Sequence, residues 1–448
     1  MMERAQRTRP RFVPTTRVAP GGYDSIRLLI GEPGSARVVG VLRRQFDHRG
    51  PSVMPNGHEH ATDASAPVQI TDTGSPFDGA SNPEPGIALC LSGGGYRAML
   101  FHLGALWRLN EWGYLPKFTR VSSVSGGSIT AGVLGCKWGR LAFDANGIGR
   151  RFDVEVVQPI RALAGRTIDE GSILGGVFLP GSIADKVADA YRKHLFGNAT
   201  LQDLPADPPR FVINATNVQS GALWRFSRPF MADYRVGMIH NPTIEMAVAV
   251  AASSAFPPVL SPLKLELNAT DYQPPSGQRS EDLHFGRYLT DVVLTDGGVY
   301  DNLGLETAWK RYQTILVSDG GGKLAAQEEP KSDWARHALR VNELIDNQVR
   351  SLRKRLTIQS FIDKTRSGTY WGIRSHTADY HLSDPLPCPP EKTLILANTV
   401  TRLKGMDSTL QERLINWGYA IFDTAMRAWV DRTLAKPGGF PFPASGVG

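Results

Sequence analysis

The segment 118–134 limits the possible fold more than any other part of the chain. It begins as a buried strand, ends as a helix, and turns sharply at Ser125. Such a turn tolerates only small residues two positions before and two positions after the serine, and Ser123 and Gly127 meet this requirement. The other serines of the segment each have a larger residue at one of these positions. The pattern predicts a hydroxyl exposed at a helix N-terminus, typical of nucleophilic catalysis. The alternative is a Ser/Gly loop that only starts a helix.

Length and charge set loose limits on the class of protein. The 448 residues suffice for one large domain or for two to three ordinary ones, and 41% of them are hydrophobic, which is enough for a large core. The net charge of +7 is small for this length. The basic residues are neither concentrated nor interleaved with aromatic residues, so we expect no nucleic-acid partner. The charge is compatible with attraction to anionic lipid surfaces.

The cysteines and the apolar segments indicate the cellular compartment of the protein. Cys90, Cys136 and Cys388 are scattered and form neither a disulfide framework nor a zinc spacing, which favours a reducing compartment. No apolar run follows the basic N-terminus, so we expect no signal peptide. The longest apolar stretch, 246–252, is far shorter than the ~20 residues of a membrane span. We expect a cytoplasmic protein whose contact with a membrane is at most peripheral.

Composition divides the chain into three parts. Residues 1–85 are rich in Arg, Pro, Gly, Asp and Ser, and we expect a partly disordered extension in which His58 and His60 are solvated rather than metal ligands. In residues 86–325 strands alternate with helices. This predicts an α/β core with a central, mostly parallel sheet flanked by helices. Residues 326–448 are expected to form a helical part that packs on the core or continues it.

The element pattern is specific enough to give ranges. Strands are expected at 87–91, 118–121, 211–213, 288–294 and 314–317. Helices are expected at 97–112, 183–195, 242–253, 303–311, 332–366 and 407–430. Residues 332–366 are expected to form a long polar helix or a pair of helices, which includes the basic residues Arg350, Arg353, Lys354 and Arg355. This segment is either solvated or a contact surface for lipid headgroups.

A serine nucleophile also needs hydrogen-bond donors at the carbonyl oxygen that it attacks. The run Gly93-Gly94-Gly95 between a strand and a helix leaves backbone N–H groups uncovered. Together with the N–H of Gly126, two or three donors can converge on one oxyanion, each typically contributing ~3–4 kcal/mol in the transition state. Arg97 is expected to anchor this loop or to add positive potential. No Gly-Lys-Ser/Thr follows, so the phosphate-binding P-loop pattern fails.

Asp296 is the preferred base. It ends an apolar strand and is followed by the turn Gly297-Gly298, which places its carboxylate at the strand edge where α/β enzymes build their sites. Asp319 also ends an apolar strand and precedes two glycines. We prefer Asp296 because its turn continues as a polar run into a helix, whereas Asp319 is expected to support the sheet edge or a loop.

Histidine is the alternative base of a hydrolase triad. His376 and His381 come late enough in the chain, but neither sits beside a strand end or a glycine turn. We therefore expect a two-residue dyad in which Asp296 accepts the proton of Ser125 directly, with no metal or organic cofactor.

Three motifs of this chain, taken in their order along the sequence, resemble the patatin-like phospholipase family. The motifs are Gly93-Gly94-Gly95-Tyr96-Arg97, Ser123-Val124-Ser125-Gly126-Gly127 and Asp296-Gly297-Gly298. The stretches 214–217 and 252–258 also look similar to the family, and the resemblance covers roughly residues 86–325. It implies that Ser125 is the nucleophile, that Asp296 is its base and that the glycine loop is the oxyanion hole.

The sequence departs from the family pattern at two positions. Ser123 replaces the first glycine of the serine turn, and Ala98 replaces the last glycine of the loop; both are small, so we expect the geometry to be kept. The resemblance implies a serine lipid acyl-hydrolase of the phospholipase A or lysophospholipase type, acting on lipid esters. The alternatives are a small-ester esterase or thioesterase with the same residues, and a non-catalytic lipid-binding regulator.

Overall fold

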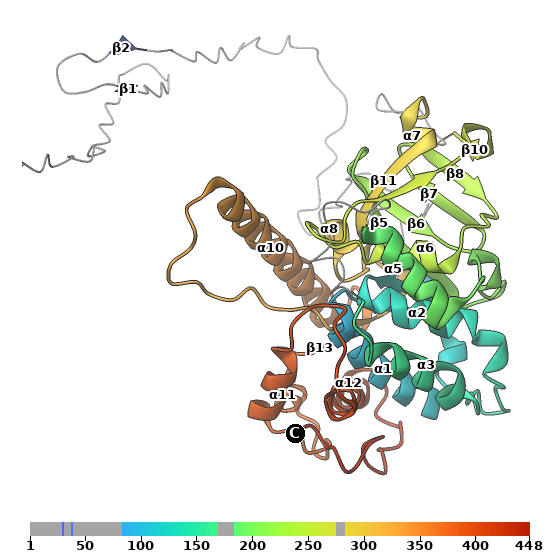
Figure 1. Ribbon diagram of the computed structural model, residues 1–448. Helices are drawn as coiled ribbons and strands as arrows, with labels where there is room; N and C mark the ends of the chain where they lie inside the picture. The colour runs from blue at the N-terminus through green and yellow to red at the C-terminus, as the bar shows by residue number, and fades with distance from the viewer. Residues whose placement is uncertain (1–28, 31–36, 39–82, 169–182, 275–282) are drawn as a thin grey trace, which may run out of the picture. The chain divides into compact units, whose positions relative to one another are not determined.

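The computed structural model describes residues 29–30, 37–38, 83–168, 183–274 and 283–448 (Figure 1). The chain divides into two units, residues 1–70 and 71–448. In the first unit, strands β1 (Leu29–Ile30) and β2 (Arg37–Val38) pair antiparallel. Apart from residues 29–30, 37–38 and 83–85, the extension 1–85 lies outside the described residues, and so do His58 and His60.

The second unit is built on one large sheet. Among the described residues it has eleven strands, and its centre is parallel in the order β5-β4-β3-β12-β13. These strands are β3 (Glu84–Leu91), β4 (Arg120–Val124), β5 (Arg210–Asn217), β12 (Tyr312–Asp319) and β13 (Ser367–Gly372). Their middle residues are buried, as expected for parallel strands covered by helices on both faces. The predicted α/β fold with a mostly parallel central sheet is confirmed.

An antiparallel wing, which the sequence pattern did not predict, extends the sheet beyond β5. It contains β6 (Ala222–Phe226), β7 (Phe230–Asp233), β8 (Gly237–His240) and β10 (Tyr272–Gln273). A second branch contains β9 (Leu263–Glu266) and β11 (Asp291–Asp296). The strand expected at 288–294 begins only at Asp291, because the one-turn helix α7 (Arg287–Thr290) precedes it.

Two strands share one edge of β5, and this arrangement positions the site. β4 runs parallel to the first half of β5, with Val124 opposite Asn214. β11 runs antiparallel to the second half, with Asp296 opposite Ala215. Because β6 occupies the other edge of β5, β4 and β11 lie end to end and their carboxyl ends meet.

Helices cover both faces of the sheet. Leu89 and Leu91 of β3 point into the larger core, whereas Ala88 and Cys90 point into the smaller one. Facing the larger core are α1 (Gly95–Glu111), α2 (Gly126–Cys136), α3 (Gln158–Ala164), α5 (Ile183–Tyr191), α6 (Met246–Ser253), α11 (Pro390–Ala397) and α12 (Ser408–Trp429). On the side of the smaller core are α8 (Gly298–Asp301), α9 (Glu306–Trp309) and α10 (Trp334–Ile362).

The C-terminal third contributes to the same sheet and core. β13 adds a parallel strand beside β12, and α12 packs along α1 (Figure 1). Asp407 caps α12, its carboxylate accepting the N–H of Leu410 at 2.9 Å. The division at residue 325 stays a prediction. Within the described ranges, every helix is too short or too polar to cross a bilayer.

Candidate active site

Ser125 lies on a strained turn between β4 and α2. Its φ of 51° is rare for a residue other than glycine, and it is held there because the backbone N–H donates to Ser253 Oγ at 2.9 Å. The turn is also crowded. A Cβ added to Gly126 would overlap the carbonyl oxygen of Gly95, and one added to Gly127 would overlap that of Leu91. This explains why only small residues surround the serine.

A group of serine hydroxyls lies behind this turn. Ser128 Oγ donates to Ser123 Oγ at 3.0 Å and lies 2.9 Å from Ser253 Oγ, which donates to the carbonyl of Asn214 at 2.6 Å. Ser123 therefore supplies a hydrogen-bonding group where the family pattern has a glycine. Sequence reasoning missed the part played by Ser253. The one sequence feature that pointed toward Ser253 was the similarity of residues 252–258 to the family.

Asp296 meets Ser125 where β4 and β11 end. Its side chain is only 1% exposed, and Oδ1 accepts the N–H of Gly298 at 2.6 Å. Burial raises the pKa of Asp296 to about 7, against the opposing hydrogen bonds from the Gly298 N–H and the Ser125 hydroxyl. Oδ2 has no well-formed hydrogen bond to any described residue. The Ser125 hydroxyl is thus beside the carboxyl without a tight hydrogen bond in the resting site, as is common before substrate binds.

Asp319, the competing candidate, has a different environment. Burial alone would raise its pKa, but the charge of Arg350 and hydrogen bonds from Tyr370 and Gly321 hold the pKa below its usual value. Tyr370 Oη donates to Asp319 Oδ2 at 2.6 Å, and the Gly321 N–H donates to Oδ1 at 2.9 Å. Asp319 therefore has its ionised form favoured, and both of its carboxylate oxygens are engaged in supporting a loop.

The glycine loop brings unpaired N–H groups to the same place. Gly94 and Gly95 have φ of 144° and 60°, and among the described residues their N–H groups and that of Gly126 have no acceptor. The N-termini of α1 and α2 touch at Gly95 and Gly126, so both helix dipoles point at one spot. Gly93 differs, because its N–H donates to the carbonyl of Asn302 at 3.0 Å. This favours Gly94, Gly95 and Gly126 as the donors.

Two buried side chains hold the loop in place. Arg97 Nε and Nη2 each donate to the carbonyl of Gly320 at 3.1 Å, and Nη1 donates to that of Thr399, so its charge anchors the loop instead of facing Ser125. His102, which no sequence pattern singled out, places Nε2 2.9 Å from the carbonyl of Ser92. Burial lowers the pKa of His102 to about 4, so it stays neutral with Nε2 as the donor.

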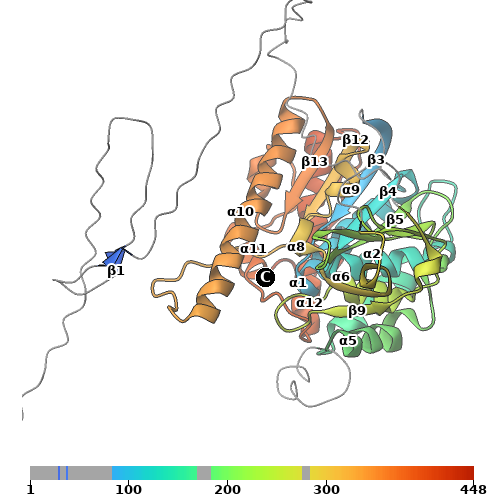
Figure 2. The same cartoon turned by 90° about the horizontal axis from the view of Figure 1, so that it is seen from above.

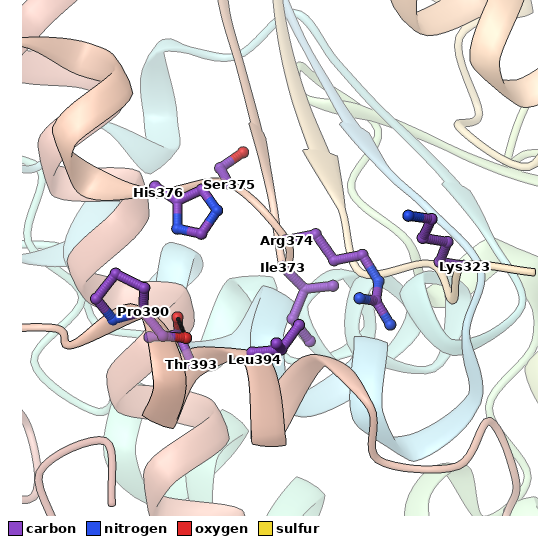
Figure 3. Close-up of a pocket in the computed structure, with 8 residues that line it drawn as sticks. All are labelled: Lys323, Ile373, Arg374, Ser375, His376, Pro390, Thr393 and Leu394. Atoms are coloured by element: carbon purple, nitrogen blue, oxygen red, sulfur yellow. Dashed lines mark hydrogen bonds between the residues drawn. The ribbon is translucent and has the colours of Figure 1, made fainter. Parts of the chain in front are cut away.

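The histidines considered as bases lie elsewhere. His381 follows a short 3-10 helix that ends at Tyr380. His376 lines a cavity of about 230 Å³ at the carboxyl end of β13, together with Lys323 and Arg374 (Figure 3). This cavity contains none of the candidate catalytic residues. A hydrolase triad with a histidine is therefore not assembled among the described residues.

Residues 89–309 match the model of the patatin-like phospholipase family. The matched region contains all three motifs, from Gly93 to Gly298. The chain therefore carries a patatin-like phospholipase domain, and the resemblance seen in the sequence is confirmed. No curated protein matches this chain.

Several solved structures are similar to this chain. Human GIVD cytosolic phospholipase A2 with methyl gamma-linolenyl fluorophosphonate is 15% identical, with 76% of this chain and 57% of that chain covered and a TM-score of 0.43. VipD from Legionella pneumophila is 17% identical, with 75% and 66% covered and a TM-score of 0.28. The complex of SpcU and ExoU from Pseudomonas aeruginosa gives 17% identity, 62% and 53% coverage and a TM-score of 0.21. The chain spans about half the length of the human structures that it matches.

Proposed function

We propose that this protein is a serine lipid acyl-hydrolase of the phospholipase A or lysophospholipase type. The observation that carries the proposal is the meeting of β4 and β11 on one edge of β5, which sets Ser125 beside Asp296. The unpaired N–H groups of Gly94, Gly95 and Gly126 adjoin this pair.

The reaction needs no group beyond these residues. Ser125 Oγ bonds to the ester carbonyl carbon while its proton passes to Asp296, and the oxyanion accepts hydrogen bonds from the loop N–H groups. The C–O bond to the alcohol breaks, and the alcohol leaves with the proton from Asp296. Water then attacks the acyl-enzyme, Asp296 takes its proton and returns it to Ser125, and the fatty acid is released.

The surroundings favour an apolar acyl substrate. Val299 follows the Gly297-Gly298 turn and is 53% exposed, and Phe256 is 58% exposed. Phe256 follows Ala255, whose carbonyl accepts the N–H of Asp296 at 2.9 Å. Large apolar side chains exposed beside a catalytic pair are costly in water and suit a lipid chain.

A substrate series tests the proposal. We expect fatty acid release from phospholipid or lysophospholipid vesicles, and a rate on p-nitrophenyl esters that rises with acyl length, with Ser125→Ala as the inactive control. Turnover confined to short esters or to acyl thioesters would instead favour a small-ester esterase or a thioesterase. A complete lack of turnover would favour the lipid-binding regulator. We also propose a cytoplasmic location, which rests on the scattered cysteines, and peripheral membrane contact, which follows from a lipid substrate.

The rate should depend on pH through Asp296. The base acts only when ionised, and the pKa of Asp296 is raised to about 7, so kcat/KM for a soluble ester should rise with pH and level off above about pH 7. Asp319 cannot produce this rise, because its lowered pKa keeps it ionised throughout. Measuring kcat/KM from pH 5 to 9 checks this, and a profile that is flat across that range would contradict the assignment.

A further inference from the structure

Helix α10 exposes its apolar side. Of its 29 residues, only Thr357 and Ser360 are buried. The exposed apolar side chains at intervals of three or four form what we call the α10 stripe: Trp334, Ala338, Val341, Ile345, Val349, Leu352 and Leu356. Among the larger of these, exposure runs from 38% for Val341 to 84% for Trp334. A surface helix normally turns such a stripe toward the core.

Polar contacts on the opposite side of α10 fix this orientation. Arg353 Nη1 lies 3.1 Å from Glu306 Oε2, and Arg350 Nη2 donates to the carbonyl of Gly322 at 3.0 Å. The ammonium of Lys354 lies 4.6 Å from the ring centroid of Tyr370. Because the charged face is bound to the rest of the protein, the helix cannot rotate to bury the stripe. Figures 1 and 2 show α10 standing out from the side of the protein.

The spacing of the stripe argues against a left-handed coiled-coil partner. From Trp334 to Leu356 the stripe takes six steps over 22 positions, an average of about 3.7 residues. This is longer than the 3.5-residue repeat of a left-handed coiled coil and is close to the period of a straight helix. Such a stripe stays in line along the whole helix and suits a flat surface.

The charge of α10 and of the whole chain indicates which kind of flat surface the stripe contacts. α10 contains six Lys or Arg residues and two acidic ones. Because Arg350, Arg353 and Lys354 are held against the rest of the protein, the attraction to a surface comes from the exposed Arg336 and Arg355 and from the net charge of +7 of the chain. An amphipathic helix with basic residues and an exposed tryptophan has the composition of a helix that lies in the interface of a bilayer. Anionic lipids attract such a helix.

The polar side of α10 lies close to the candidate site. Arg353 Nη1 lies 3.9 Å from Asp301 Oδ2 of α8, the short helix whose Gly298 N–H binds Asp296. The charge of Asp346 on α10 is close enough to raise the pKa of Asp296. We propose that α10 docks on the surface of an anionic bilayer through its stripe. The consequence that docking brings lipid esters to Ser125 rests on the proposed function.

Vesicle binding by a stripe variant tests the docking. Ile345 and Leu352 are each 57% exposed, so Ile345→Ser with Leu352→Ser should leave the fold intact. Losing two side chains that enter the bilayer should weaken co-sedimentation with vesicles containing phosphatidylglycerol by about tenfold or more. The control variant, Val154→Ser with Trp429→Ser, removes side chains that are 52% and 59% exposed outside α10 and should bind as the wild type does. Hydrolysis of p-nitrophenyl butyrate, which needs no membrane, should be unchanged.

The outcomes separate docking from catalysis. Loss of vesicle binding only in the stripe variant supports docking, even if no ester is hydrolysed, in which case the proposed function alone fails. Equal binding by the wild type and both variants overturns docking, whatever the activity. Light scattering that finds a dimer in the wild type and a monomer in the stripe variant also overturns it, because the stripe then binds a second copy. Equal binding to purely zwitterionic vesicles would overturn the proposal that the surface is anionic.

Discussion

Replacing Asp296 by Asn will lower kcat for ester hydrolysis by about 10⁶-fold, the size of effect found when the group that accepts the nucleophile's proton is removed from a serine hydrolase. Asn keeps the shape of the side chain and can still accept the Gly298 N–H through its oxygen, so the fold should persist. Steady-state kinetics with a soluble ester, together with a thermal denaturation curve, measure the effect.

Asp319→Asn is the matched control, since Asp319 also ends a strand before two glycines. Its carboxylate supports a loop through Tyr370 and Gly321, so its loss should lower thermal stability but reduce kcat/KM per folded molecule by less than about tenfold. If the Asp319 variant lost the activity and the Asp296 variant kept it, our assignment of the base would be reversed.

Ser125→Ala will remove ester hydrolysis almost completely, by about 10⁶-fold in kcat, because no covalent intermediate can form. A fluorophosphonate probe should label the wild type at Ser125, and mass spectrometry of the labelled peptide distinguishes it from Ser123 and Ser128. Those two hydroxyls bond each other and are fully buried, so they should stay unlabelled. Labelling of the wild type at either one, with Ser125 unmodified, would contradict the site.

Local features of this protein could be predicted from the sequence because their causes are local. The small residues around Ser125 are required by the close approach of Gly95 and Leu91, and this requirement leaves a readable spacing. The apolar periodicity of α1 and α12 and the Asp407 cap of α12 also depend on neighbouring residues, and both helices begin within two residues of the expected start.

Other features could not be predicted because they depend on distant partners. The antiparallel wing is made of strands of two to five residues, too short to show a period. His102 acts through Ser92, which follows β3, and Ser318, which lies on β12. The basic residues of 350–355 were noted in the sequence, but only their contacts with Glu306 and Tyr370 reveal that the apolar side of α10 faces outward.

The amino-acid sequence was enough to identify a strained serine turn, a glycine loop with uncovered N–H groups and an aspartate at a strand end. Each of these features is determined by steric requirements among residues a few positions apart. Whether Ser125 and Asp296 meet was a different question, because they are 171 positions apart. The pairing of β4 and β11 along one edge of β5 answers it, and pairing register is a property of the folded sheet. The same folded environment sets the charge state of Asp296, since burial raises its pKa.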